Sequence, residues 1–171
     1  YGTASKSKHD YVSENGCDHP IDYHSDDYAE EIMKLTDGRG VDVVLDALGG
    51  TDWKKGYSLL RPGGLLIPFG WANMAKYGKR RMTHVLGQFS RMPWWTPVRL
   101  MHENKGVAGV NMGHLWDERE LARGAFTALL KLYEEGALKP RVDRTFPFEQ
   151  AAEAHAYIEA GQNLGKVLLT P

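Results

Sequence analysis

The stretch that decides the fold is Gly40-Val41-Asp42-Val43-Val44-Leu45-Asp46-Ala47-Leu48-Gly49-Gly50. Its apolar run is short and β-branched, and glycines bound it at both ends, which predicts a buried parallel strand. In open α/β sheets, ligands bind beyond the carboxyl ends of the strands. We therefore expect a bound cofactor at the tip formed by residues 46–50.

Helical patterns alternate with short apolar segments on both sides of this strand. Apolar spacing and turn residues predict helices over residues 6–15 and 149–160. Three further helices are expected to start at an N-cap at Ser25 or Asp26, at Thr51, and at a capping box over 117–120. Arg61-Pro62-Gly63-Gly64 has the composition of a turn, and extended segments are expected at 19–23, 65–70, 106–112, 141–148 and 166–169. This alternation predicts an α/β fold with a Rossmann-like, doubly wound parallel sheet.

Length and composition set further bounds. The 171 residues suit one domain, and the apolar fraction of 42% is ordinary for a globular protein. A net charge of -1 gives no reason to expect nucleic acid as a partner. The single cysteine, Cys17, forms no intrachain disulfide, which favours a reducing compartment, and we predict a cytoplasmic location. No apolar run approaches the roughly 18 residues of a transmembrane segment.

Several blocks of sequence resemble the second half of the cofactor domain in medium-chain dehydrogenases/reductases. They are Gly2–Ser5 with Lys8, Gly16–Tyr23, Gly40–Asp46, Leu60–Gly64 and Gly165–Leu169. Within that superfamily the pattern is similar to the quinone oxidoreductases, and especially to the branch named after the synaptic vesicle membrane protein. The similarity to this branch lies in Asn15-Gly16, His19–His24, Lys55–Tyr57 and Asn163–Leu169.

The resemblance implies that the chain is a fragment of a longer protein. Tyr1–Ser5 reads as the end of a strand, so the family's first strand, its glycine-rich turn and its catalytic domain are expected before Tyr1. Residues 1–171 are then one NAD(P)-binding domain portion, with a C-terminal helix and strand that return to the missing catalytic domain. Alone, the fragment is expected to bind a dinucleotide weakly at best and to be inactive.

The residues after the first strand favour a phosphate. NAD-binding folds usually place an acidic residue there for the ribose hydroxyls, whereas this chain has Ser5, Lys6, Ser7 and Lys8. Hydroxyls and an ammonium accept a 2′-phosphate that a carboxylate would repel. The resemblance assigns Lys8 and Tyr23 to that phosphate, so we predict NADPH rather than NADH. The alternative is a helix start with solvated lysines.

The nicotinamide end of the cofactor is expected at two strand tips. Backbone groups of Leu48 and Gly49 are predicted near the nicotinamide ribose, although a helix-entry turn would also need glycine there. By the same reasoning, Gly70 and Ala72 belong to the site at the next tip.

More distant positions enter by resemblance. Val110 and Met112 flank the nicotinamide, although by sequence alone they are plain strand residues. Lys166 either reaches the cofactor or is a surface lysine. The basic cluster Lys79–Arg81 is an anion contact or a solvated face, and Trp94-Trp95 line a cleft or dimer seam or belong to the core.

We therefore predict the NADPH-binding portion of a zinc-independent oxidoreductase. The parent would transfer hydride to a quinone or an enone-like carbonyl compound, with reactivity supplied by the cofactor, and no residue of this chain is assigned a catalytic role. The histidines show no ligand spacing, so no metal site is predicted. A homodimer through the 106–112 edge strand follows by resemblance. The alternatives are an enoyl reductase domain of a fatty-acid or polyketide synthase and a non-catalytic adaptor.

Overall fold

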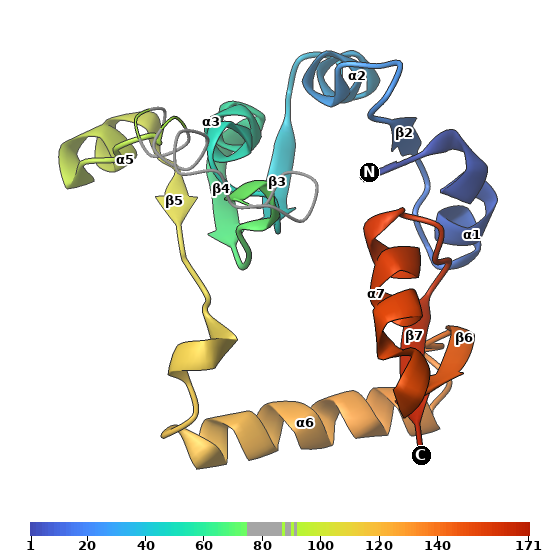
Figure 1. Cartoon of the computed structure of the whole chain (residues 1–171). Coiled ribbons are helices and arrows are strands. Elements are labelled where there is room, and N and C mark those ends of the chain that lie inside the picture. The colour runs from blue at the N-terminus through green and yellow to red at the C-terminus, as the bar shows by residue number, and fades with distance from the viewer. Residues whose placement is uncertain (75–86, 88–89, 91) are drawn as a thin grey trace. The chain divides into compact units, whose positions relative to one another are not determined.

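The computed structural model describes residues 1–74, 87, 90 and 92–171 (Figure 1). The basic cluster Lys79–Arg81 lies outside these residues. The chain forms two compact units: one comprises Tyr1, Thr3 and Ile21–Leu115, and the other comprises Gly2, Ala4–Pro20 and Trp116–Pro171. The short strands β1 (Gly2–Ala4) and β2 (Pro20–Asp22) pair with each other.

A parallel sheet organises the first unit. Its strand order is β3-β4-β5, formed by Val41–Asp46, Leu60–Pro68 and Gly106–Val107 (Figure 1). Helix α3 (Thr51–Ser58) connects β3 to β4, and α5 (Pro97–Glu103) precedes β5. The mixed α/β fold with parallel strands is therefore as predicted.

The core of this unit lies on one face of the sheet. Leu66 is fully buried, and its cluster with Tyr57 and Leu60 packs against Val44 and Trp95, among others. Trp95 is thus a core residue, whereas Trp94 is exposed.

β3 is parallel, as predicted, but it is not the fully buried strand that was predicted. Val43 and Leu45 are 51% and 68% exposed. Successive side chains of a strand point to opposite faces, and α3 covers only the face that carries Val44.

Helix α2 (Tyr28–Leu35) begins at a different cap from the one predicted. The carboxylate of Asp27 accepts hydrogen bonds from the amides of Ala29 at 2.8 Å and Glu30 at 3.3 Å, so neither Ser25 nor Asp26 is the N-cap. Asp27 takes this role because its backbone is extended, which aims the side chain at the free amides of the first turn. Ile32 of this helix packs against Ile21 and Leu59.

The turn predicted at 61–64 lies inside β4 as an irregular segment. The strand register jumps from Val41 opposite Leu60 to Val43 opposite Leu65, so four residues oppose a single one. Arg61 pairs with that residue, Asp42.

The strand predicted over 106–112 is shorter. β5 ends at Val107, although the amides of Ala108 and Val110 still donate to carbonyls of β4. The extended course stops because the Asn111 side chain accepts a hydrogen bond from the Gly113 amide at 3.0 Å. This turn places Met112 in a 3₁₀ helix, η3 (Met112–His114).

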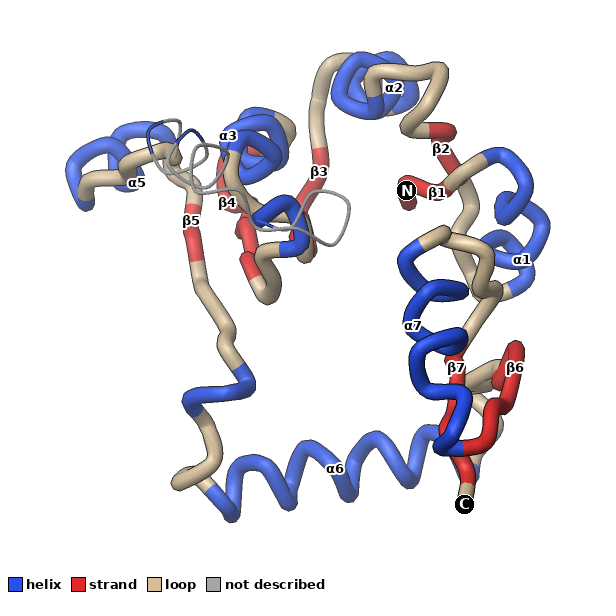
Figure 2. Tube along the Cα trace, in the orientation of Figure 1, coloured by secondary structure: helices blue, strands red, loops and turns tan. Residues whose placement is uncertain are grey.

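The second unit contains helices and a parallel strand pair (Figure 2). η1 (Lys6–Lys8) leads into α1 (His9–Glu14), and α7 (Ala151–Glu159) connects β6 (Val142–Pro147) to β7 (Lys166–Thr170).

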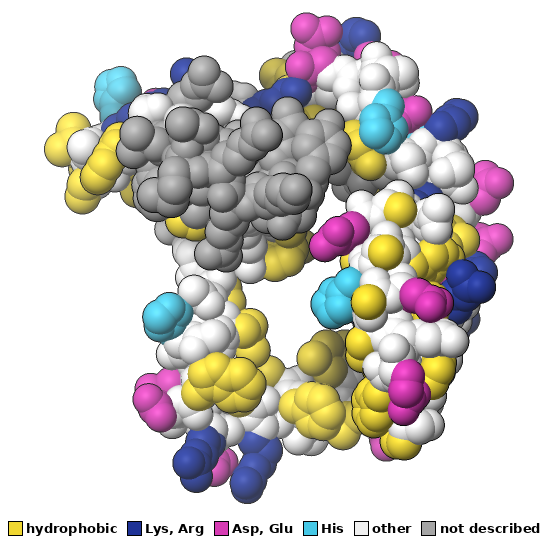
Figure 3. All heavy atoms as spheres, viewed as in Figure 1, with side chains coloured by type: hydrophobic (Ala, Val, Ile, Leu, Met, Phe, Trp, Pro, Cys, Tyr) yellow, Lys and Arg dark blue, Asp and Glu magenta, His cyan; other side chains and the backbone are white. Residues whose placement is uncertain are grey.

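Helix α6 (Arg119–Glu134) carries exposed apolar side chains, as the surface view shows (Figure 3). The capping box predicted at its start does not form, because Glu118 occupies the cap and its side chain accepts no capping bond.

Candidate functional site

The tip of β3 is closed by its last residue. Asp46 is 7% exposed, and its Oδ1 accepts hydrogen bonds from the amides of Leu48 at 2.7 Å and Gly49 at 2.8 Å. A buried carboxylate is stable when such donors satisfy it. Of the backbone groups of Leu48 and Gly49 predicted near the cofactor, both amides are engaged by Asp46, and Leu48 presents its carbonyl and its 41% exposed side chain.

The segment after β4 is bonded to the tip of β3. The Phe69 amide donates to the Asp46 carbonyl at 2.9 Å, and the Ala72 amide donates to the Ala47 carbonyl at 3.0 Å. A Cβ atom on Gly70 would lie 2.7 Å from the same Ala47 oxygen. Gly70 is thus glycine because the two tips touch, and the structure brings Leu48, Gly49, Gly70 and Ala72 into one joint edge.

Gly49 meets a second constraint. Its φ is +80°, and a Cβ atom there would lie 2.3 Å from Cδ1 of Trp71. The ring of Trp71 in turn packs against that of Trp53, with centroids 5.4 Å apart. The tip therefore fits under an aromatic pair that leaves no room for a side chain.

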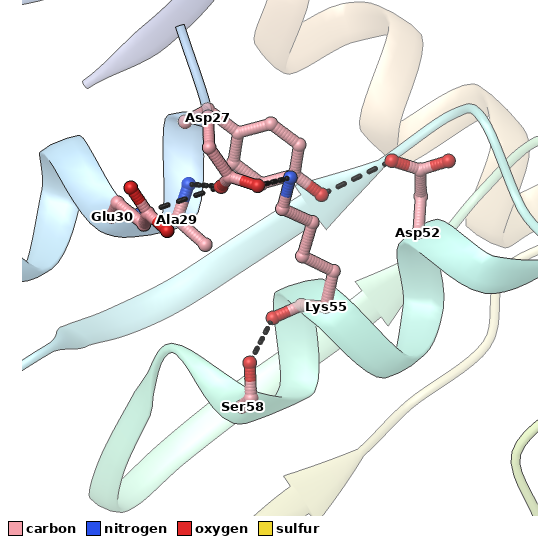
Figure 4. Close-up of polar contacts among 7 residues, drawn as sticks. Asp27, Ala29, Glu30, Asp52, Lys55 and Ser58 are labelled. Atoms are coloured by element: carbon pink, nitrogen blue, oxygen red, sulfur yellow. Dashed lines mark hydrogen bonds and ion pairs between the residues drawn. The ribbon is translucent and has the colours of Figure 1, made fainter.

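Polar contacts connect the start of α2 to α3 (Figure 4). The Lys55 ammonium lies 2.8 Å from Oδ2 of Asp27, and this hydrogen bond lowers the pKa of the Asp27 carboxyl. The same ammonium lies 4.1 Å from the centre of the Tyr28 ring. The Tyr28 hydroxyl donates to Oδ1 of Asp52 at 3.1 Å, and burial, with the Asp52 charge, raises its pKa above the usual value.

Two of the residues predicted at the 2′-phosphate, Lys8 and Ser5, lie in the second unit. The Lys8 ammonium donates to the Asn163 carbonyl at 2.8 Å, and because an ammonium has three N–H groups it can also donate to an anion. The Asn163 side chain holds its own loop by donating to the Gly165 carbonyl at 2.9 Å. Ser5 Oγ lies 3.5 Å from Ser7 Oγ.

The remaining predicted residues are at the surface of their own units. Tyr23, of the first unit, is 53% exposed and its ring lies against His24. Its pairing with Lys8 stays a prediction. Val110 and Met112 are 42% and 64% exposed, and Lys166 is exposed at the start of β7.

Sequence reasoning missed the polar residues that hold the tips. Asn73 and Asp52 carry no motif, and their roles depend on contacts across 21 to 24 residues of chain. The available signal was that Asn73 follows a strand-end glycine by three positions, where polar side chains of α/β sheets often face ligands.

Two kinds of feature are absent from the part of the chain that the structure describes. Among those residues, no three side chains of His, Cys, Asp or Glu gather as metal ligands would. Over the same residues, no helix combines the length and the hydropathy that crossing a membrane requires.

Comparison with known proteins identifies relatives over the whole chain. The chain is 43% identical to the mouse synaptic vesicle membrane protein VAT-1 homolog over 176 residues, covering 100% of this chain and 42% of that protein. It is 30% identical to a Burkholderia 2-haloacrylate reductase, covering 99% of this chain and 47% of that protein. The chain thus spans less than half the length of these curated relatives.

Solved structures share the fold. The human VAT-1 homolog-like protein superimposes with a TM-score of 0.72 at 30% identity, covering 99% of this chain and 45% of that one. A mycobacterial protein complexed with NADPH has a TM-score of 0.71 at 24% identity, with 99% and 49% covered. An NAD-dependent alcohol dehydrogenase reaches 0.69 at 24% identity, with 99% and 43% covered.

A family model described as zinc-binding dehydrogenase matches residues 15–169, nearly the whole chain. Together with the VAT-1 homologues, this match agrees with the blocks that resemble medium-chain dehydrogenases/reductases. The chain belongs to the zinc-binding dehydrogenase family of the medium-chain dehydrogenase/reductase superfamily, in the branch of the VAT-1 homologues.

Proposed function

We propose that this chain binds the NADPH of a zinc-independent oxidoreductase, as one NAD(P)-binding domain portion of a longer protein. The observation that carries the proposal is the joint edge at the carboxyl ends of β3 and β4, where the Asp46–Gly50 tip and the Phe69–Asn73 segment are bonded together. Ligands of parallel α/β sheets bind at such edges. The relatedness to a 2-haloacrylate reductase and the fold shared with an NADPH complex support the same class.

The chemistry of the edge suits the nicotinamide half of the cofactor. The Leu48 carbonyl accepts a hydrogen bond from the Asn73 amide at 2.9 Å, and a carbonyl oxygen has two lone pairs, so it can accept a second one. A ribose hydroxyl donates to such an acceptor. The exposed side chains of Leu48 and Phe69 offer apolar surface to a flat ring. When bound, the cofactor supplies the hydride, and the residues of this chain orient it.

The choice of NADPH over NADH rests on Lys8, with Tyr23 and Ser5 as its expected neighbours at the phosphate. The test compares Lys8→Glu with Lys6→Glu in the full-length protein. Both replace a lysine of the same 3₁₀ turn, but Lys6 is exposed and Lys8 is partly buried against the Asn163 carbonyl. Lys8→Glu is expected to weaken NADPH about tenfold or more, since a charge-assisted bond contributes about 1.5–3 kcal/mol, and to leave NADH unchanged. Equal losses for both cofactors refute the 2′-phosphate assignment.

The substrate of the parent is proposed to be a quinone or an enone-like carbonyl compound, which accepts hydride directly from the cofactor. The similarity of the sequence blocks to those of quinone oxidoreductases supports both a quinone or enone substrate and a reaction that does not depend on zinc. Steady-state assays of the full-length protein with NADPH and a quinone, before and after chelator treatment, test both. Loss of activity on chelation contradicts zinc independence, and activity restricted to acyl-thioester enones favours the enoyl reductase class.

A homodimer through the edge strand remains part of the proposal. β5 lies at the end of the β3-β4-β5 sheet in the described residues, and an edge strand offers unpaired backbone groups to a second copy. The mass in solution tests this, and a monomeric full-length protein contradicts it. We keep the proposal that the cofactor contacts Val110 and Met112, which follow the edge strand, and Lys166.

A further inference from the structure

Asn73 connects the segment after β4 to the tip of β3 through hydrogen bonds. Its side-chain Nδ2 donates to the Gly49 carbonyl at 3.2 Å and to Oδ2 of Asp52 at 2.8 Å, and its backbone amide donates to the Leu48 carbonyl at 2.9 Å. A single residue thus holds both carbonyls of the tip, while Asp46 holds both amides.

Asp52 fixes the orientation of the Asn73 amide group. One carboxylate oxygen accepts the hydrogen bond from Asn73 and the other accepts the Tyr28 hydroxyl at 3.1 Å. The Lys55 ammonium lies 4.1 Å from the centre of the Tyr28 ring. The same ammonium pairs with Asp27 (Figure 4). The carboxylate therefore ties the Asn73 amide to helices α2 and α3.

The tip needs such bonds because two consecutive glycines follow Leu48. Glycine populates positive φ without a steric penalty, and Gly49 and Gly50 adopt φ of +80° and +65°. Unfastened, the pair would sample many conformations, and ordering them on binding would cost affinity. Bonds that fix the carbonyls in advance reduce that cost.

We propose that Asn73 and Asp52 are positioning residues that hold the Leu48–Gly49 backbone in the conformation that receives the nicotinamide half of the cofactor. This inference rests on the proposed NADPH-binding function. It assigns the two residues an effect on one half of the cofactor only, because the contacts lie at the strand tips and not at Lys8.

The test measures two ligands in the full-length protein. NADPH carries both halves of the cofactor, whereas adenosine 2′,5′-bisphosphate carries only the adenosine half with its 2′-phosphate. Asn73→Leu removes the amide at similar size, and Asp52→Asn removes the charge and one acceptor. The matched control is Asn15→Leu, because the exposed Asn15 side chain donates, among the residues that the structure describes, to the Tyr11 carbonyl of its own helix end at 2.8 Å.

Asn73→Leu is expected to raise the Kd for NADPH about tenfold, since two hydrogen bonds are lost, and to leave the Kd for adenosine 2′,5′-bisphosphate unchanged. Asp52→Asn is expected to act in the same direction with a smaller change, and it carries the test if Asn73→Leu does not fold. Asn15→Leu is expected to change neither constant. Circular dichroism confirms that each variant is folded.

Two results with the variants overturn the inference while the proposed function stands: equal weakening of both ligands in the folded variants, or no weakening of NADPH. A wild-type protein that binds neither ligand refutes the proposed function itself, and the inference with it. A wild-type protein that binds both ligands equally tightly shows that the nicotinamide half adds nothing, and it also overturns the inference.

Discussion

Gly49→Ala is expected to destabilise the protein for two separable reasons. The new Cβ would sit on a backbone with φ of +80°, which costs roughly 1–2 kcal/mol. It would also lie 2.3 Å from Cδ1 of Trp71, and overpacking of this kind costs typically about 1–3 kcal/mol. The sum predicts a loss of about 2–5 kcal/mol in the free energy of unfolding.

Gly63→Ala separates the two costs. Gly63 has nearly the same φ, +85°, but the atom nearest to a Cβ placed there is Nη1 of Arg61 at 3.7 Å, an ordinary contact. Only the backbone cost of about 1–2 kcal/mol applies there. Gly49→Ala should therefore be the more destabilising substitution by about 1–3 kcal/mol.

Urea denaturation of the full-length protein and both variants measures this difference. A third comparison places Gly49→Ala in a Trp71→Ala background, where the excess cost is expected to disappear because the colliding ring is gone. The reasoning is refuted if the two glycine substitutions are equally costly, or if the excess survives the removal of Trp71.

Four further substitutions, one of them a control at an exposed position, test the packing and the charges. Leu66→Ala, at a fully buried position, is expected to cost about 2–5 kcal/mol, whereas Val98→Ala, at a 69% exposed position, is expected to stay within about 0.5 kcal/mol in the same denaturation assay. Asp27→Asn keeps the helix cap but loses the charge toward Lys55. Because the folded-state pKa of Asp27 is lowered, the stabilisation from its charge is present at neutral pH and is lost as the pH falls below about 4. The unfolding free energies of wild type and variant should therefore converge in acid, and a difference that does not change with pH contradicts the pairing. Tyr28→Phe removes a hydroxyl whose pKa is raised on folding. The hydroxyl therefore contributes to the free energy of unfolding below about pH 10, and this contribution is lost at higher pH. The free energy of unfolding should fall less steeply above about pH 10 in the variant than in the wild type, and identical slopes would refute the Asp52 contact.

Much of the first unit could be predicted from the sequence because its signals are local. The β-branched run at 41–45 and the glycines around it identify β3, and the turn residues at 61–64 mark an irregularity that does interrupt the pairing of β4. The helix ends were harder to predict. Ser25, Asp26 and Asp27 are all good caps, and only the extended backbone at Asp27 selects among them.

The site itself depends on contacts that no local pattern contains. Gly70 was predicted as part of the site. The carbonyl that leaves no room for a side chain at this position belongs to Ala47, which follows a different strand, and the local sequence does not show this contact. Likewise, backbone groups of Leu48 and Gly49 were predicted near a cofactor, but the sequence did not show that Asp46 accepts hydrogen bonds from both of their amides. Side-chain acceptors compete for backbone donors, and the outcome follows from geometry that sequence spacing does not fix.

The most direct test of the proposed site is a crystal structure of the full-length protein with NADPH. The proposal predicts the nicotinamide ribose at the Leu48 carbonyl, beside Gly70 and Ala72, and the 2′-phosphate at Lys8. A nicotinamide bound away from the carboxyl ends of β3 and β4 would contradict it.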